Sequence, residues 1–99
     1  MRFQADLHRL DRHTELIRKE LHEAKALEYS LRRAVDGAMD EESRRLLTQQ
    51  LRLAAQIREH IEGRLAWTEN ALEKLRRAVK EARGKLSAAV DNAKRAFDP

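Results

Sequence analysis

The side chains best suited to metal or acid–base chemistry in this chain are its four histidines, His8, His13, His22 and His60. A Glu-x-x-His motif on each of two facing helices would build a di-iron site, and two histidines three or four residues apart would offer zinc a pair on one helix face. These histidines have neither an acidic residue three positions before them nor the required mutual spacing. Because the chain also has no cysteine, the sequence predicts surface histidines, with neither a metal nor a cofactor.

Residues for covalent or phosphate chemistry have no supporting sequence context. Ser30, Ser43 and Ser87 lie in helical sequence or at a helix start, without the strand–turn–helix context that activates a serine. The three glycines are isolated, so they form no phosphate-cradling loop. The adjacent carboxylates Glu41 and Glu42 suit the first turn of a helix, where the helix dipole favours negative charge. We therefore expect the chain not to be an enzyme.

Positive charge is concentrated in the last quarter of the chain. Residues 74–99 hold eight basic and three acidic side chains, whereas residues 1–73 hold 13 basic and 14 acidic ones. Nucleic-acid binding would favour aromatic stacking platforms among these cations, and Phe97 is the only aromatic residue there. A membrane surface would favour a bulky apolar face opposite the cations, but alanine dominates this segment. An acidic protein partner fits the segment, and a solvated helix flank is the alternative.

The composition predicts long helices as the elements that carry these residues. Of the 99 residues, 38% are charged and 4% are aromatic, and the apolar residues are mostly leucine and alanine. The charged stretch of residues 1–16 has no apolar segment typical of a signal peptide. No run of residues approaches the ~20 apolar positions of a transmembrane helix. We expect one helical domain, residues 1–99, in a cytoplasmic protein.

Apolar residues recur at alternating steps of four and three in the first part of the chain, which predicts a helix over residues 4–35 with one buried seam. The seam comprises Phe3, Leu7, Leu10, Ile17, Leu21, Ala24, Leu31 and Val35, interrupted by Thr14 and Glu28. Leu16, Leu27 and Ala34 widen this stripe, which indicates more than one neighbouring helix. Polar seam residues can fix the register of paired helices, although a loosely packed seam would also tolerate them.

Residues 36–40 have the composition of a tight turn between two helices. Gly37 can adopt the left-handed conformation that closes a helix. Asp40 is a good N-cap, because its carboxylate can accept hydrogen bonds from the free amides of the next turn. The sequence therefore predicts a second helix that begins at residue 41.

The same stepping continues from residue 41 to residue 97 without loss of phase, which predicts one long second helix. Its seam comprises Leu47, Leu51, Ala54, Ile61, Leu65, Leu72, Leu75, Val79, Ala82, Leu86, Ala89, Ala93 and Ala96, interrupted by Arg58 and Thr68. The expected fold class is all-α, an antiparallel helical hairpin or coiled coil with a short first and a long second helix. A break near residues 63–70 would instead give a three-helix bundle.

Folding about residues 38–39 would place Phe3 opposite Leu75 and would leave the second helix without an intramolecular partner beyond that point. We expect a non-catalytic coiled-coil interaction or scaffold protein. It would either self-associate, with a dimer favoured, or dock a protein partner through the C-terminal half of this helix. Nucleic-acid or anionic-surface binding is the less favoured alternative. The candidate partner-binding residues are Trp67, Arg76, Arg77, Val79, Lys80, Arg83, Leu86, Val90, Lys94, Arg95 and Phe97.

Two aromatic residues, Trp67 and Tyr29, lie off the predicted seam. Aromatic residues in such positions often belong to a second interface, with a symmetry mate or with a partner. A third helix of the same chain that covers them is the alternative.

Overall fold

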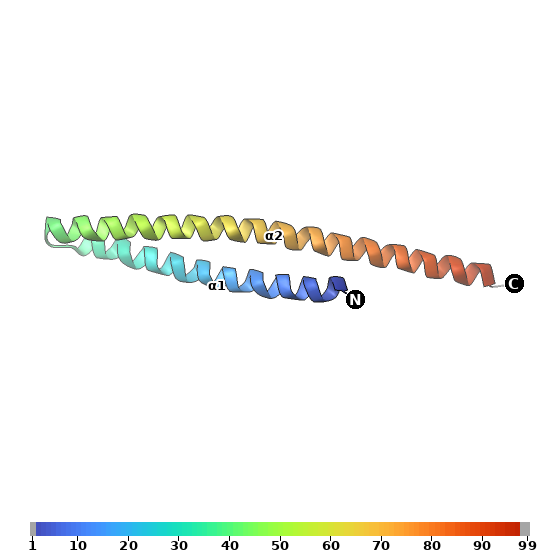
Figure 1. Ribbon diagram of the computed structural model, residues 1–99. Helices are drawn as coiled ribbons and strands as arrows, with labels where there is room; N and C mark the ends of the chain where they lie inside the picture. Colours follow the sequence, from blue (N-terminus) through green and yellow to red (C-terminus); the bar gives the residue numbers. More distant parts are fainter. Residues whose placement is uncertain (1, 98–99) are drawn as a thin grey trace.

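The chain forms an extended hairpin of two antiparallel α-helices (Figure 1). The computed structural model describes residues 2–97, with the side chains of residues 4–97. Helix α1 spans Arg2–Gly37, helix α2 spans Glu41–Phe97, and the hairpin measures 89 × 18 × 14 Å. The predicted all-α hairpin with a short first and a long second helix is therefore confirmed. Because α2 runs unbroken through residues 63–70, the alternative of a three-helix bundle is wrong.

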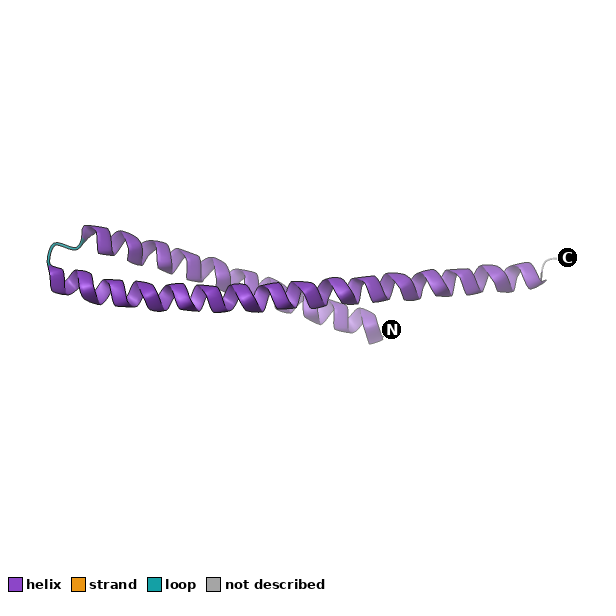
Figure 2. Ribbon diagram, turned by 90° about the horizontal axis from the view of Figure 1, so that it is seen from above, coloured by secondary structure: helices purple, strands orange, loops and turns teal. Residues whose placement is uncertain are grey.

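One seam holds the two helices together as they cross at a shallow angle (Figure 2). The predicted seam positions within residues 7–35 of α1 and 47–79 of α2 are all buried or half-buried. The most tightly packed part comprises Ile17, Leu21, Ala24, Ile61 and Leu65. Burial of each leucine or isoleucine stabilises a fold by about 1.5–3 kcal/mol relative to exposure, so the seam is the main source of stability.

The turn between the helices comprises residues 38–40, so it begins two residues later than the predicted turn of residues 36–40. Gly37 is the last residue of α1 and does not have a positive φ, so no left-handed glycine closes this helix. The Ala38 amide instead donates to the Val35 carbonyl, and the Arg44 guanidinium donates to the Ala38 carbonyl, both at 3.2 Å. A long side chain from α2 thus caps α1 in place of the expected glycine conformation.

Asp40 caps the start of α2, as predicted. Its Oδ1 accepts a hydrogen bond from the Ser43 amide at 3.1 Å, and its carbonyl accepts one from the Arg44 amide at 3.1 Å. Hydrogen bonding from the Ser43 side chain, and then from the Ser43 amide, lowers the pKa of the Asp40 carboxyl. The carboxylate therefore stays ionised, and continues to cap the helix, at lower pH than an unpartnered aspartate would.

The two helices overlap further than predicted. Leu75 lies beside Leu10, with which it lines one hollow, so the prediction that Leu75 lies opposite Phe3 is wrong. The side chain of Phe3 itself lies outside the described residues. The difference amounts to about two helical turns. It arises because α2 begins beyond the level at which α1 ends, with residues 38–40 running partly along the hairpin axis (Figures 1 and 2).

One pair of opposite charges crosses the seam, Glu28 of α1 and Arg58 of α2. Arg58 Nε donates to Glu28 Oε2 at 2.5 Å, and Arg58 also donates to both carboxylate oxygens of Glu62 at 3.1 Å. The hydrogen bond to Glu28, followed by that to Glu62, raises the pKa of the Arg58 guanidinium. In the predicted register Glu28 would face Leu51 and Arg58 would face Leu21. Because an unpaired charge against an apolar side chain is costly, the pair selects the observed register.

The other two polar seam residues, Thr14 and Thr68, satisfy their hydroxyl groups within their own helices. Thr14 Oγ1 donates to the Leu10 carbonyl, and Thr68 Oγ1 donates to the Arg64 carbonyl, both at 2.7 Å. Both threonines are buried, so this arrangement leaves no unsatisfied hydroxyl in the seam. Neither threonine therefore requires a particular partner on the opposite helix, and neither selects the register.

Candidate interaction surfaces

Helix α2 continues beyond α1 as an exposed arm, defined here as residues 80–97 (Figure 1). Every residue of the arm is exposed, whereas Val79, immediately before it, is 8% exposed. The predicted seam continues onto the arm through Ala82 and Leu86, where α1 no longer covers it. Within the described part of the chain, the arm is therefore the portion of α2 whose seam has no neighbouring helix.

The larger apolar residues of the arm lie along one face of α2. Leu86, Val90, Ala93 and Phe97 follow one another at steps of four, three and four, so they share one side of the helix. The last three line a hollow of about 450 Å³ together with Lys94. These four apolar residues are called the arm stripe. It brings together the predicted partner-binding residues Leu86, Val90 and Phe97, of which Phe97 is 88% exposed.

Cations surround the arm stripe. The arm holds two acidic and five basic side chains, and the basic ones are Lys80, Arg83, Lys85, Lys94 and Arg95. All five are exposed, and four of them were predicted as partner-binding residues. Arg83 lies beside α1, because it lines a hollow together with Leu7 and Asp11. Lys80 comes one turn before Arg83, whereas Lys85, Lys94 and Arg95 lie further along the arm.

Four predicted partner-binding residues lie outside the arm. Val79 is buried in the hairpin, so its assignment to a partner surface is wrong. Arg76 pairs with Asp11 of α1 at 3.3 Å, and Arg77 pairs within α2 at 2.7 Å. Trp67 is 73% exposed, but it lies where α1 covers the seam of α2. The longer overlap of the helices explains why Val79 and Arg76 contact α1, because the seam stays intramolecular as far as Val79.

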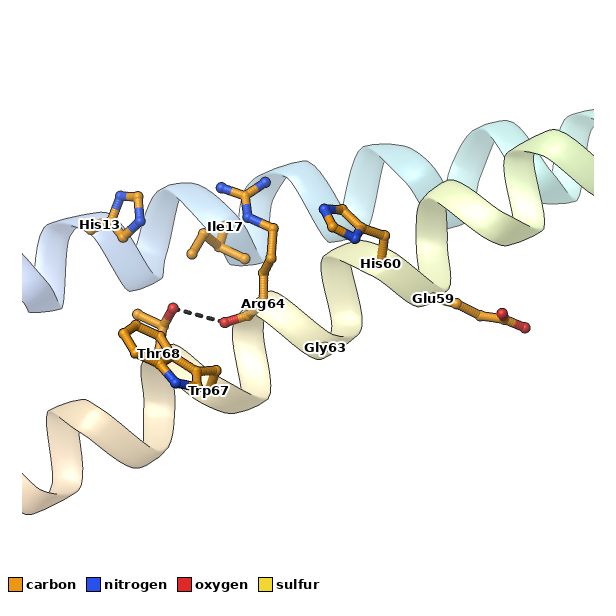
Figure 3. Close-up of a pocket in the computed structure, with 8 residues that line it drawn as sticks. All are labelled: His13, Ile17, Glu59, His60, Gly63, Arg64, Trp67 and Thr68. Carbon is orange, nitrogen blue, oxygen red and sulfur yellow. Dashed lines mark hydrogen bonds between the residues drawn. The ribbon is translucent and has the colours of Figure 1, made fainter.

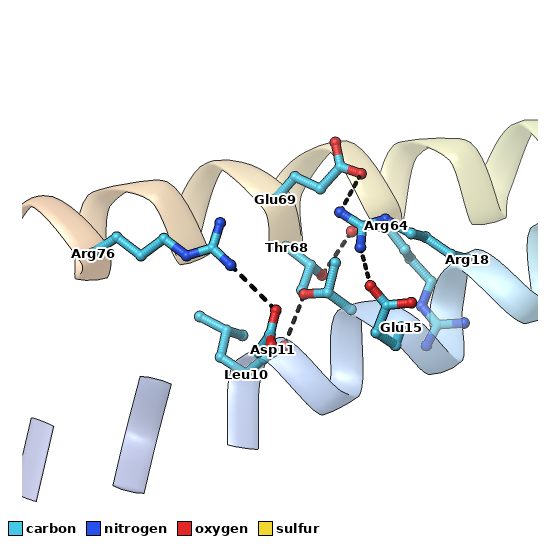
Figure 4. A network of polar contacts seen from close by, with 9 residues as sticks. Leu10, Asp11, Glu15, Arg18, Arg64, Thr68, Glu69 and Arg76 are labelled. Atoms are coloured by element: carbon cyan, nitrogen blue, oxygen red, sulfur yellow. Dashed lines mark hydrogen bonds and ion pairs between the residues drawn. The ribbon is translucent and has the colours of Figure 1, made fainter. Parts of the chain in front are cut away.

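One long side of the hairpin is lined by ion pairs. Arg18 of α1 contacts both Glu15 and Glu69, and Arg76 contacts Asp11 further along (Figure 4). All five residues come one position after a seam residue in their own helix. The cross-helix pairs show that these positions of the two helices lie on the same side, which is called the charged flank.

The opposite side of the hairpin carries large apolar side chains. Glu20 and Arg64 each come one position before a seam residue, and their ion pair at 3.4 Å shows that these positions also share one side. Six exposed apolar residues likewise come one position before a seam residue, namely Leu16, Leu27, Leu46, Leu53, Ile57 and Trp67. This side, with those six residues, is called the apolar flank. Leu46, Leu53 and Ile57 were not predicted as functional residues, although their constant offset from the seam could have identified them.

The two off-seam aromatic residues lie on opposite flanks. Trp67 precedes the seam residue Thr68 and belongs to the apolar flank, whereas Tyr29 follows the seam residue Glu28 and belongs to the charged flank. Tyr29 is 60% exposed, with the Arg33 guanidinium 5.9 Å from its ring centre. No third helix covers either residue in the described part of the chain.

The apolar flank contains a hollow of about 560 Å³ beside Trp67 (Figure 3). Ile17 of the seam lines it, and His13 and His60 border it from the two helices. Gly63 contributes no side chain, and among the described residues no neighbouring atom outside its own stretch of helix lies within 4 Å of the place that its Cβ would take. The missing side chain of Gly63 therefore leaves room on this flank.

No group of three or more His, Cys, Asp or Glu side chains that could hold a metal ion occurs in the part of the chain that the structure describes. Over the same residues, neither helix has a stretch apolar enough to cross a membrane. Comparison with known proteins found no matching family model, no matching curated protein and no matching solved structure. The arm and the two flanks are therefore the features from which a function is inferred.

Proposed function

We propose that this chain is a non-catalytic interaction protein that docks an acidic amphipathic helix of a partner protein onto the arm. The observation that carries the proposal is the end of the covered seam at Val79. Beyond this residue α2 continues as a helix with an apolar stripe that α1 does not reach. A partner helix can occupy, along the arm, the position that α1 occupies along the rest of α2.

A partner would supply the packing that the arm lacks. Most helical stability in proteins comes from burial of an apolar face rather than from intrinsic propensity. The arm contains Gly84, which costs a helix about 1 kcal/mol relative to alanine. Leu86, Val90 and Phe97 are exposed, and burial of such side chains is worth about 1.5–3 kcal/mol each before the costs of association. Partner binding would therefore stabilise the helix of the arm as well as the complex.

Charge favours an acidic partner. Because the arm holds five basic and two acidic side chains, two arms packed against each other would bring like charges together. An acidic helix would place carboxylates beside Lys94, at the edge of the arm stripe, and beside the other cations. Complementary charge also raises the rate of association.

Nucleic-acid or anionic-surface binding is the second candidate function, favoured by the same cations. Unlike the docking of an acidic helix, phosphate binding depends on the positive charge of the arm and not on the arm stripe. It predicts affinity that falls steeply between ~50 mM and ~200 mM salt and that survives the loss of the apolar side chains. Substitutions in the stripe therefore separate the two functions.

Fluorescence anisotropy with a labelled synthetic acidic amphipathic helix tests the proposal on the full chain. Leu86→Gln and Val90→Gln should each weaken binding about tenfold, because each removes an apolar side chain from the stripe. Ala88→Gln is the matched control, since Ala88 is exposed on the arm but lies away from the stripe, and it should leave the affinity unchanged. A second synthetic helix with the same apolar seam, in which basic residues replace the acidic ones, should bind far more weakly.

Two results would contradict the proposal. If the acidic helix does not bind the full chain at high-micromolar concentration, the arm does not dock such a partner. If polyglutamate or a single-stranded oligonucleotide binds as tightly as the acidic helix, and the stripe variants bind unchanged, the arm is an electrostatic surface and the second candidate function takes the place of the first.

A further inference from the structure

We infer that a second copy of this chain covers the apolar flank, so that two hairpins form a four-helix dimer. The inference rests on side chains of the overlapped part of the hairpin, and it is independent of the proposed function of the arm. The six residues of the apolar flank come from both helices, and each precedes a seam residue by one position, with polar residues such as Glu20, Glu23 and His60 at the same offset between them. They therefore gather on one side of the hairpin, one group around Leu53 and Ile57 and the other at Leu16 and Trp67.

The apolar flank has the area of a stable interface. Its side chains range from 50% exposed for Leu46 to 73% exposed for Trp67. Together the six present on the order of 600 Å² of surface, in two groups on either side of the Glu20–Arg64 pair. With the polar groups around them, the area approaches the ~800 Å² per partner of a standard interface. A second copy would bring a surface of the same length and the same area.

The apolar flank carries fewer charges along its centre than the opposite side, and this difference allows the assembly to stop at two copies. Its charged residues at the same offset from the seam are Asp6, Arg9, Glu20, Glu23, Arg64 and Lys74, and among them Glu20 and Arg64 neutralise each other at 3.4 Å. The opposite side carries the ion pairs of Arg18 and Arg76 and does not have a matching apolar stripe among the described residues. Because only one side of the rod is apolar, a contact between two such sides leaves no equivalent surface for a third copy.

The order of residues along the apolar flank selects how the second copy is oriented. Leu16 and Trp67 lie about one turn from the Glu20–Arg64 pair, both toward the end of the hairpin where the arm begins. A two-fold axis along the hairpin places Glu20 over Arg64 of the second copy and Leu16 over its Trp67. An axis across the hairpin at the level of the pair would instead place like charges over each other. In the first arrangement each α1 packs over the second copy's α2, and both arms leave the dimer at the same end.

The hollow beside Trp67 gives the second copy a place to insert a large side chain (Figure 3). Its volume is about 560 Å³, and Gly63 adds no side chain to it. With the two-fold axis along the hairpin, the second copy's α1 lies over the part of α2 that lines most of this hollow, so Leu16 of the second copy comes nearest to it and covers Trp67. Buried tryptophan in a pocket near the centre of an interface is a frequent source of binding energy.

Sedimentation equilibrium of the full chain across a wide concentration range tests the inference. A mass of twice the 11.6 kDa of one chain is expected at high concentration. Leu53→Gln and Ile57→Gln should each raise the dissociation constant of the dimer at least about tenfold, and both hairpins should still fold because the two side chains are exposed. Tyr29→Gln, on the charged flank, is the matched control and should leave the dimer unchanged.

Fluorescence supplies a second readout, because Trp67 is the only tryptophan. Its emission should shift to shorter wavelength with rising concentration in the native chain and in Tyr29→Gln, and this shift should be lost in Ile57→Gln. A monomer mass at every concentration would overturn the inference. So would a dimer that Leu53→Gln and Ile57→Gln leave intact and Leu86→Gln abolishes, because such a dimer would be joined through the arms.

Small-angle scattering of the dimer tests its orientation. The axis along the hairpin predicts a maximum dimension close to the 89 Å of one hairpin, with a thicker cross-section. A dimer substantially longer than one hairpin would have its arms at opposite ends and would overturn the proposed arrangement. Neither result bears on the binding of an acidic helix to the arm, so the two proposals can fail separately.

Discussion

Arg58 reaches across the seam to Glu28, and this contact joins the charged interruptions of two otherwise apolar stripes. Glu28 is 8% exposed, so its carboxylate depends on this partner rather than on water. Buried ion pairs are often not net stabilising, but removal of one member leaves an uncompensated charge. The contact is therefore best understood as a device that specifies the register of the helices.

Glu28→Leu should lower the melting temperature of the hairpin by roughly 10 °C, because Arg58 would face an apolar side chain across the seam and keep ion pairs only within its own helix, including the one with Glu62. The double substitution of Glu28 and Arg58 by leucine should recover most of this loss, since it replaces the pair by an apolar contact. Thermal denaturation followed by circular dichroism at low protein concentration measures both. A double variant as unstable as the single one would show that the pair itself supplies stability.

The same double variant should lose register. The chain has no native cysteine, so a Leu10→Cys and Leu75→Cys pair can report the register by disulfide formation. We expect a high yield of the disulfide with Glu28 and Arg58 present and a lower yield after both become leucine, because heptad-shifted pairings then cost little. An unchanged yield would mean that the turn alone sets the register.

Thr14→Val should raise the free energy of unfolding by about 0.5–1 kcal/mol. The hydroxyl of the fully buried Thr14 bonds only the Leu10 carbonyl, which still accepts a backbone hydrogen bond within the helix after the substitution. Thr48→Val is the control, because Thr48 makes the same bond to Arg44 at a half-buried site off the seam. Urea denaturation compares the two, and a loss of stability in Thr14→Val would show that the hydroxyl has a further partner.

Gly63→Ala should raise the free energy of unfolding by about 1 kcal/mol, because alanine favours the helix and the added methyl group meets open space. Gly84→Ala should increase the helicity of the arm without a comparable change in global unfolding, since every residue of the arm is exposed. Denaturation at low concentration measures the first effect, and amide hydrogen exchange measures the second. Destabilisation by Gly63→Ala in a monomeric sample would contradict the open geometry at this site.

Asp40→Ala should lower the melting temperature by a few degrees at pH 7 and much less in acid. The pKa of Asp40 is lowered in the folded chain, so its capping contributes stability above the unfolded pKa and loses it as pH falls through the folded value. Asp40→Asn retains an acceptor that does not titrate, and it should keep its cap at low pH. Melting temperatures of the three proteins between pH 7 and pH 2 test this, and a native–alanine difference that persists at pH 2 would contradict it.

The seam could be predicted from the sequence because burial against another helix requires the four–three spacing, and this spacing held throughout the overlap. The register could not, because a periodic stripe fits its partner equally well after a shift of one heptad. The polar interruptions contained the missing information. Glu28 and Arg58 interrupt the two stripes with opposite charges, and pairing these charges aligns the helices in the observed register.

The surfaces were predicted less completely. The exposed arm followed from the unequal lengths of the helices, although its start moved from Leu75 to Val79 with the register. Leu46, Leu53 and Ile57 individually look like ordinary exposed residues, and they form a flank only once each is placed relative to the seam. The predicted end of α1 was wrong because the Arg44 side chain of α2 bonds the Ala38 carbonyl and the Ala38 amide bonds the Val35 carbonyl, so Gly37 need not adopt the left-handed conformation.

Backbone amide NMR of the full chain, titrated with the synthetic acidic amphipathic helix, tests the central claim most directly. If the arm docks such a helix, amide shifts should be concentrated in residues 83–97, with the largest changes along the arm stripe. Amides around Ile17 and Ile61 in the seam should not move. Shifts confined to the apolar flank around Leu53 and Trp67, or no shifts at saturating peptide, would contradict the account of the arm.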